Sequence, residues 1–246
     1  MVDPSDDAAL RFSNSREAVM AAYRAGDYST ALNATEGLRD GTSKTARYCF
    51  YRGTMLHQLG RLNEAEAILR EGLLLENNPL SRVLAVNTLA TVLMDQKRFS
   101  EAIEFYQLAH RAWSDRGASL RGIAEIWLRQ GREFQEALKQ AHLAVAIDKR
   151  ARGLSKKVLE QRLGEDLAVL SWALAANSAG AGTVEFLVIE ALRLCSDGAV
   201  TQLAEIHYHA GQAYLALQNT DKSREHFRHA AEIDPQGIFG RMACTA

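Results

Sequence analysis

Small side chains recur along this sequence at nearly constant intervals, and in the first four copies a bulky residue stands three positions before the small one. The small residues are Ala31, Ala65, Ala102, Ala137, Val184 and Ser223. Their successive separations are 34, 37, 35, 47 and 39 residues. A period of this length indicates a chain that is built by stacking similar units rather than around one centre.

Each unit is predicted to be a helical hairpin. Turn signals such as Gly26-Asp27 and Gly60-Arg61 supply permissive backbone between two helices. The bulky residues at the start of each second helix are Tyr28, Leu62, Phe99 and Phe134. The small residues where we expect paired helices to touch are Gly53, Ala90, Ala124 and Gly211. Because only three prolines occur in 246 residues, little interrupts these helices, and the fold class is all-α.

The chain resembles the tetratricopeptide repeat family most clearly in its second and last copies. The second copy has Cys49-x-x-Arg52-Gly53-x-x-Leu56 followed by Gly60, Ala65 and Leu69. The last has Ala210-Gly211-x-x-Tyr214 followed by Phe227, Ala230 and Asp234-Pro235. The resemblance implies a right-handed superhelical solenoid of about six such hairpins, an α-α superhelix whose first helices line the concave side.

The repeat divides the chain into unequal parts. We expect an N-terminal tail at 1–11, four regular hairpins at 12–148, a basic insertion or helix extension at 149–164, two irregular hairpins at 165–235 and a C-terminal tail or cap at 236–246. A lengthened helix from about Ser155 to Ala176 is the simplest way to house the insertion. The register of the fifth unit is uncertain, because Gly180-Ala181-Gly182 replaces its usual turn.

Composition narrows the function. Lysine plus arginine (29) nearly balance aspartate plus glutamate (30), which disfavours nucleic acid as the partner. The three cysteines do not have the spacing of a disulfide framework or of a zinc site. The sequence shows neither an export signal nor a membrane-spanning run, so we expect a cytoplasmic protein without membrane insertion. No phosphate-binding loop, metalloprotease motif or nucleophile elbow occurs. We therefore expect no enzyme activity, no cofactor and no metal.

The family resemblance implies a scaffold that binds a peptide or helix of a partner protein in its concave groove. Mapping the family's inward positions onto this sequence gives the candidate groove residues Arg16, Tyr23, Phe50, Thr54, His57, Asn87, Thr91, Arg121, Glu125, Leu128, Tyr208 and Gln212. For each of them the competing interpretation is packing on a neighbouring helix. An alternative function is a regulatory or substrate-recruiting arm of a larger enzyme or sensor whose active domain lies outside this chain.

Three further features have two interpretations each. Arg152, Lys156 and Lys157 form either a solvated helix face or an anionic docking site. His226 and His229 share a helical face, but no carboxylate or cysteine completes a metal site, so surface or capping roles are favoured. The apolar pair Ile238-Phe239 either caps the array or supports self-association through its open ends.

Overall fold

The computed structural model describes residues 4–39, 44–75 and 79–246, and within these ranges the regular structure is entirely helical. The first helices of the six hairpins are α1 (Pro4–Arg24), α3 (Ala46–Gln58), α5 (Pro79–Asp95), α7 (Ala118–Arg129), α9 (Lys156–Ala176) and α11 (Val200–Ala216). The second helices are α2 (Tyr28–Ala34) with its 3-10 extension η1 (Thr35–Leu38), α4 (Leu62–Leu75), α6 (Phe99–Ala112), α8 (Phe134–Arg150), α10 (Ala181–Leu194) and α12 (Thr220–Ile233). A short helix, α13 (Ile238–Ala243), follows the last hairpin.

The predicted small residues lie where paired helices meet. Ala31, Ala65, Ala102, Ala137 and Val184 are fully buried, and each belongs to the second helix of its hairpin. A β-carbon placed on Gly53 would approach the Leu69 side chain to 2.5 Å, and one on Gly211 would approach the Phe227 ring to 2.6 Å. Small residues at these sites therefore allow the two helices of a hairpin to pack at close distance.

Each hairpin turn contains a residue with left-handed backbone, and the fourth turn contains a second one, Glu133, with φ of 52°. The residues with positive φ at these turns are Gly26, Gly60, Lys97, Gly131, Ser178 and Gln218, with φ values between 60° and 77°. Glycine adopts this conformation without steric cost, whereas other residues are strained there by contact between the β-carbon and the backbone. A left-handed residue is thus common to all six turns, although only half of the copies carry glycine there, and the fourth and fifth turns are one residue longer than the others.

Three segments refine the predicted boundaries. α1 begins at Pro4, so residues 4–11, expected to form a tail, are helical. The Ser155 hydroxyl accepts a hydrogen bond from the Val158 amide and caps α9, which runs to Ala176 as expected for the lengthened helix. The residues after Pro235 form α13, whose Ile238 and Phe239 are buried against the last hairpin.

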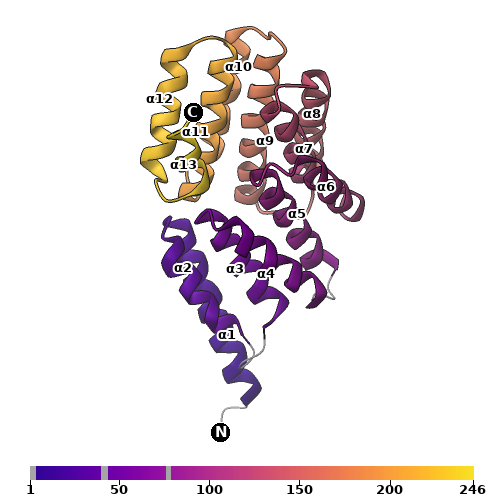
Figure 1. Ribbon diagram of the computed structural model, residues 1–246, viewed down its shortest axis with the longest axis vertical. Coiled ribbons are helices and arrows are strands. Elements are labelled where there is room, and N and C mark those ends of the chain that lie inside the picture. Colours follow the sequence, from indigo (N-terminus) through magenta and orange to yellow (C-terminus); the bar gives the residue numbers. More distant parts are fainter. Residues whose placement is uncertain (1–3, 40–43, 76–78) are drawn as a thin grey trace.

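The array curves until its two ends meet. From α3 to α11 each first helix contacts the next one, and α9 contacts α7 and α11. Figure 1 shows the start of α2 beside the last hairpin, and the hydroxyl of Tyr28, the first residue of α2, donates a 2.5 Å hydrogen bond to Asp234 Oδ2. Two large apolar clusters, one from the N-terminal and one from the C-terminal hairpins, both contact Trp127. None of the described helices has the length and apolarity needed to cross a bilayer.

The turn geometry gives a first prediction. Gly131 has φ of 64° and no atom within 4 Å of an added β-carbon, so Gly131→Ala tests backbone strain alone. We expect a loss of about 1 kcal/mol in the free energy of unfolding, measured by urea denaturation. Gly182 in α10 has equally open surroundings but no positive φ, and Gly182→Ala should be neutral or stabilising by about 0.5 kcal/mol. Equal effects of the two changes would contradict the strain argument.

Candidate functional site

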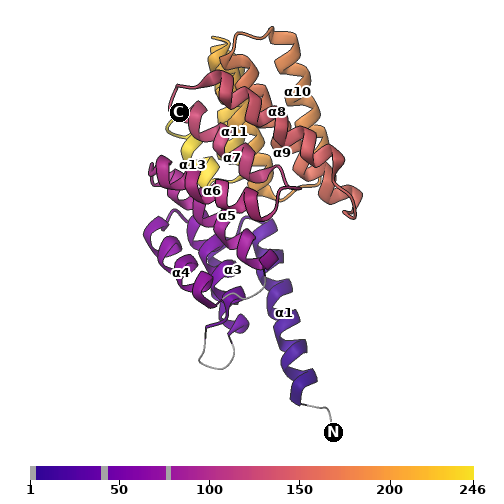
Figure 2. The ribbon, with the colours of Figure 1, turned by 90° about the vertical axis from the view of Figure 1, so that its right-hand side faces the viewer.

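The curved array encloses a channel, defined here by two cavities that adjoin α13 on different faces. The first cavity has a volume of about 470 Å³ and touches Ile238 and Met242, one turn apart on α13. The second has about 540 Å³ and touches Phe239. α13 contacts α11 and α12 of the last hairpin, and Figure 2 shows it between that hairpin and the N-terminal half of the array. Side chains from the first helices and from α13 therefore share the concave surface.

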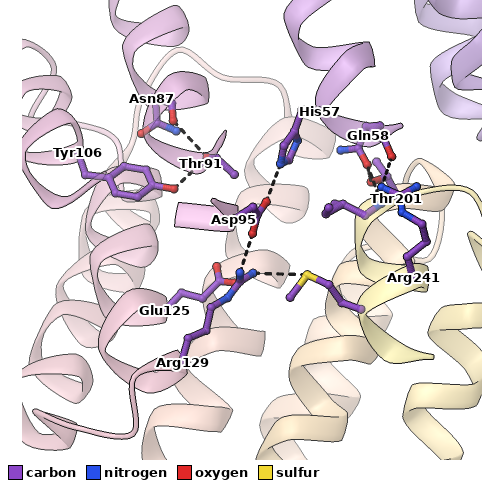
Figure 3. Close-up of polar contacts among 12 residues, drawn as sticks. His57, Gln58, Asn87, Thr91, Asp95, Tyr106, Glu125, Arg129, Thr201 and Arg241 are labelled. Atoms are coloured by element: carbon purple, nitrogen blue, oxygen red, sulfur yellow. Dashed lines mark hydrogen bonds and ion pairs between the residues drawn. The ribbon is translucent and has the colours of Figure 1, made fainter. Parts of the chain in front are cut away.

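Five inward side chains form a connected row of ionisable groups that joins α3, α5, α7 and α11, and two of them, Asp95 and Arg129, line the first cavity. His57 Nε2 lies 2.6 Å from Asp95 Oδ2, and Arg129 Nη1 lies 2.6 Å from Asp95 Oδ1. Arg129 also pairs with Glu125, whose Oε1 is 3.3 Å from His209 Nε2. Figure 3 shows His57, Asp95 and Arg129 in line, with Glu125 beside the guanidinium. We call these five residues the charge row.

Mutual pairing keeps Asp95, Glu125 and Arg129 ionised in spite of their burial. Burial by itself raises the pKa of Glu125, but Arg129 and His209 outweigh it and lower that pKa to about 2. Burial also opposes the ionisation of Asp95, yet Arg129 and His57 hold its pKa below the ordinary value. Arg129 in turn has a raised pKa, because the two carboxylates outweigh its desolvation. These three side chains are therefore charged at neutral pH.

The C-terminal segment is bound to the channel by polar and aromatic contacts. Arg241 Nη2 donates to the Gln58 main-chain oxygen at 2.8 Å, and the Ile238 amide donates to Gln58 Oε1 at 3.4 Å. The Phe239 ring lies 5.7 Å from both the Tyr208 and the His209 ring centroids. In Figure 3 the Arg241 side chain extends toward Gln58 at the end of α3. The segment thus connects the second hairpin with the sixth.

Acidic groups dominate the wall of the second cavity. Glu165 is engaged, since Arg121 Nη2 lies 2.6 Å from its Oε2 and Gln202 Nε2 donates to its Oε1 at 2.7 Å. Glu205 also lines the cavity, and burial together with the neighbouring Glu165 raises its pKa. Burial likewise raises the pKa of Asp166 to about 7, although Arg121 opposes the shift. The interior near α9 therefore holds two acidic groups, Asp166 and Glu205, whose ionisation is opposed by burial.

Several predicted groove residues are covered by the chain itself. The buried ones are His57, Glu125, Leu128 and Tyr208. His57 and Glu125 belong to the charge row, Tyr208 lies against Phe239, and Leu128 lines the first cavity. In this structure these side chains contact other parts of the same molecule, as the competing interpretation of packing expects, and their role in binding a partner stays a prediction.

The other predicted groove residues fall into two groups. Partners within the chain engage Thr54 (Phe50 oxygen), Asn87 (Ser119), Thr91 (Tyr106) and Arg121 (Glu165 and Asp166). The remaining ones are Arg16, which is exposed; Tyr23, at the second cavity; Phe50, in a hollow of about 110 Å³ with Leu84; and Gln212, at the first cavity. The open part of the predicted groove is therefore smaller than the sequence mapping indicates.

The remaining candidates stay predictions. Arg152, Lys156 and Lys157 are exposed, and Lys157 also borders the second cavity. His226 and His229 are joined by His207, whose Nδ1 lies 2.9 Å from His226 Nδ1, but the described residues contain no group of three ligands arranged for a metal. Burial lowers the pKa of both His207 and His226 to about 4, so this pair is neutral at physiological pH.

Sequence mapping missed Asp95, Arg129, His209 and the two residues that join α13 to α3. The sequence contains a pattern that indicates some of these residues. Gln58, Asp95 and Arg129 each stand two residues before the left-handed turn residue of their hairpin. Polar side chains at one repeat position in consecutive units are expected to lie side by side. Aligning the copies at their turns, rather than at the small residues, would have indicated this part of the wall.

The buried pairs of the charge row predict a large loss of stability when one carboxylate is replaced by an amide. Asp95→Asn removes one of the two carboxylates that compensate the buried Arg129 guanidinium, together with the acceptor of His57, so we expect a loss of about 3–5 kcal/mol in the free energy of unfolding. Glu64→Gln is the matched control, because its pair with Arg61 is exposed, and its effect should be much smaller. Chemical denaturation at pH 7 measures both, and similar losses would contradict a structural role for the row.

For Glu205 we expect the opposite effect, because replacing this carboxylate should raise the free energy of unfolding rather than lower it. Its raised pKa means that the folded state holds a proton more tightly than the unfolded state, so stability falls as pH rises from about 4.3 toward the folded value. Glu205→Gln should remove this loss and stabilise the protein at pH 8, on the order of 1 kcal/mol, while changing little at pH 4. Melting temperatures at both pH values test it. The exposed Glu104→Gln should show no such difference.

Comparison with known proteins gives family matches at both ends of the array. Two models described as tetratricopeptide repeat match residues 16–82 and 204–236, which span the first two hairpins and the last one. No curated protein matches the sequence. The matched segments contain the second and last copies of the repeat, where the sequence pattern is clearest.

Solved structures share the architecture at low identity. BtubC (BKLC) from P. vanneervenii is 17% identical, with 97% of this chain and 92% of that chain covered and a TM-score of 0.51. YrrB, a TPR protein with an unusual peptide-binding site, is 19% identical over 82% of this chain and 92% of its own, with a TM-score of 0.38. The C-terminal part of a TPR protein from Cytophaga hutchinsonii is 14% identical over 92% and 97%, with a TM-score of 0.44.

Likeness at such identities reflects the fold alone. The assignment depends instead on the family matches and on the hairpins themselves, with their buried small residues and uniform turns. The fold predicted from the sequence is confirmed, and repeats of this kind generally form interaction scaffolds rather than catalytic sites. The chain is a tetratricopeptide repeat protein.

Proposed function

We propose that this protein is a non-enzymatic scaffold that binds a peptide or short helix of a partner protein in its channel. The observation that supports the proposal best is the first cavity. It opens beside α13 and takes its lining from the second to the sixth hairpins as well as from the residues after the last hairpin. A ligand in this cavity would contact several repeats at once, as partners of solenoid proteins do.

The lining of the first cavity suits an amphipathic ligand. Its apolar members are Leu62, Met94, Phe99, Leu128, Trp172, Ile238 and Met242. Its polar members are Asp95, Lys97, Arg129, Tyr208, Gln212 and Thr245. Apolar surface with a few placed polar groups is typical of grooves that receive one face of a helix.

The charge row argues for binding rather than for catalysis. Asp95 and Glu125 have lowered pKa values and are held by Arg129, so neither is set up to exchange a proton near neutral pH. Asp95 and Arg129 instead supply fixed charges in the wall of the cavity, where they restrict which ligand polar groups can be buried.

A peptide-library selection against the full chain tests the site. Selected peptides should bind the protein and lose about tenfold in affinity, or about 1.4 kcal/mol, in the variants Lys97→Glu and Gln212→Glu, because both positions line the first cavity. Lys139→Glu on α8 is the matched control, since Lys139 is exposed and outside the cavity. Peptides that bind the cavity variants and the parent protein equally would overturn the proposed site.

A further inference from the structure

The C-terminal helix fills the channel only in part. Protein interiors are close-packed, with few voids larger than a water molecule. Here cavities of about 470 and 540 Å³ adjoin the six-residue α13, one beside Ile238 and Met242 and the other beside Phe239. The channel therefore has room for a longer or bulkier helix than the one it holds.

The wall around α13 also contains polar groups that α13 does not satisfy. His209 is fully buried against the Phe239 ring, and neither of its ring nitrogens has a hydrogen-bond partner among the described residues. Its Nε2 lies 3.3 Å from Glu125 but is not aligned for a hydrogen bond. The Nε atom of Arg129, at the first cavity, is likewise without a partner. Buried polar groups of this kind are usually satisfied, so the wall fits a ligand with more polar atoms than α13 offers.

We propose that α13 occupies the binding site of the partner and mimics it. The partner is a longer amphipathic helix with an aliphatic and an aromatic residue side by side and an arginine two positions later, as in Ile238, Phe239 and Arg241. It enters by displacing α13. This inference deepens the proposed function and rests on it.

The contacts of α13 define which partner groups the channel recognises. The aromatic side chain packs between Tyr208 and His209, and the arginine reaches the carbonyl at the end of α3, where Gln58 ends the helix. Carbonyl groups at a helix C-terminus attract cations, so a lysine or arginine of the partner is favoured there over an acidic residue. The same geometry disfavours a partner whose corresponding position is aspartate or glutamate.

The hinge for displacement lies directly after the last hairpin. Asp234 is held by the Tyr28 hydroxyl and accepts a hydrogen bond from the Gly237 amide, whereas Pro235 and Gln236 are exposed. Rotation within this link would release α13 and leave the contact between the first and last hairpins in place. The ring closure and the occupancy of the channel are therefore separable.

Displacement can be followed in the full chain through its own cysteines. Cys244 is exposed directly after α13, whereas Cys49 and Cys195 are buried, and burial raises their pKa values to about 11 and 12. A maleimide fluorophore will therefore react selectively at Cys244. Gly240→Ala is the releasing variant, because a β-carbon there would overlap the main-chain carbonyl of Asp234. Gly182→Ala, with open surroundings, is the control.

The expected result has two parts. Fluorescence anisotropy of the label should fall in Gly240→Ala and stay unchanged in the control. A synthetic peptide of residues 235–246 should then bind Gly240→Ala with a Kd below about 1 mM, the scale of effective concentration for a tethered segment, and bind the parent protein at least about tenfold more weakly. A peptide with Arg241→Glu should not bind either protein.

Other outcomes separate this inference from the proposed function. Equal affinity of the peptide for both proteins, or no binding to a folded Gly240→Ala variant with a released label, overturns the mimicry. The affinity of library peptides could depend on Lys97 and Gln212 while the label on Cys244 stays immobile when they bind. That result supports the proposed binding site and refutes the displacement of α13. Phe239→Ala provides a second releasing variant should Gly240→Ala not fold, as judged by circular dichroism.

Discussion

The arrangement of the hairpins around the channel depends on Asp95. This buried carboxylate lies between the imidazole of His57 and the guanidinium of Arg129, and Arg129 continues the row to Glu125. Buried charges are tolerated only when each finds its partner, and a slip of one helical turn between neighbouring first helices would leave several of them unpaired. The charge row thereby selects one register for hairpins that share similar apolar surfaces.

The ring closure gives the solenoid a property that an open array lacks. Terminal repeats usually expose one side to solvent, but here the Tyr28 hydroxyl meets Asp234 across the ends of the array, and α13 covers inward surface of the last hairpin. The hydroxyl is buried with its acceptor, so the contact excludes water.

The buried inward side chains both hold the first helices in place and present positioned polar groups to a ligand. The charge row and the Arg121 pairs with Glu165 and Asp166 hold the first helices from α3 to α11, while the cavities beside α13 remain unfilled. A surface whose polar groups are already positioned costs a ligand little reorganisation. The same surface excludes ligands that place the wrong charge beside the row.

The sequence alone determined the family, the hairpins and their turns. Small residues such as Ala65 and Gly211 and bulky ones such as Phe99 act within one hairpin, so local spacing is enough to place them. The tertiary structure decided which inward residues stay open. Superhelical closure brings Gln58 beside Arg241, 183 positions apart, and no repeat pattern encodes a contact between units so distant in sequence. Small rotations between neighbouring units accumulate along the array, and their sum decides that α13 lies in the channel.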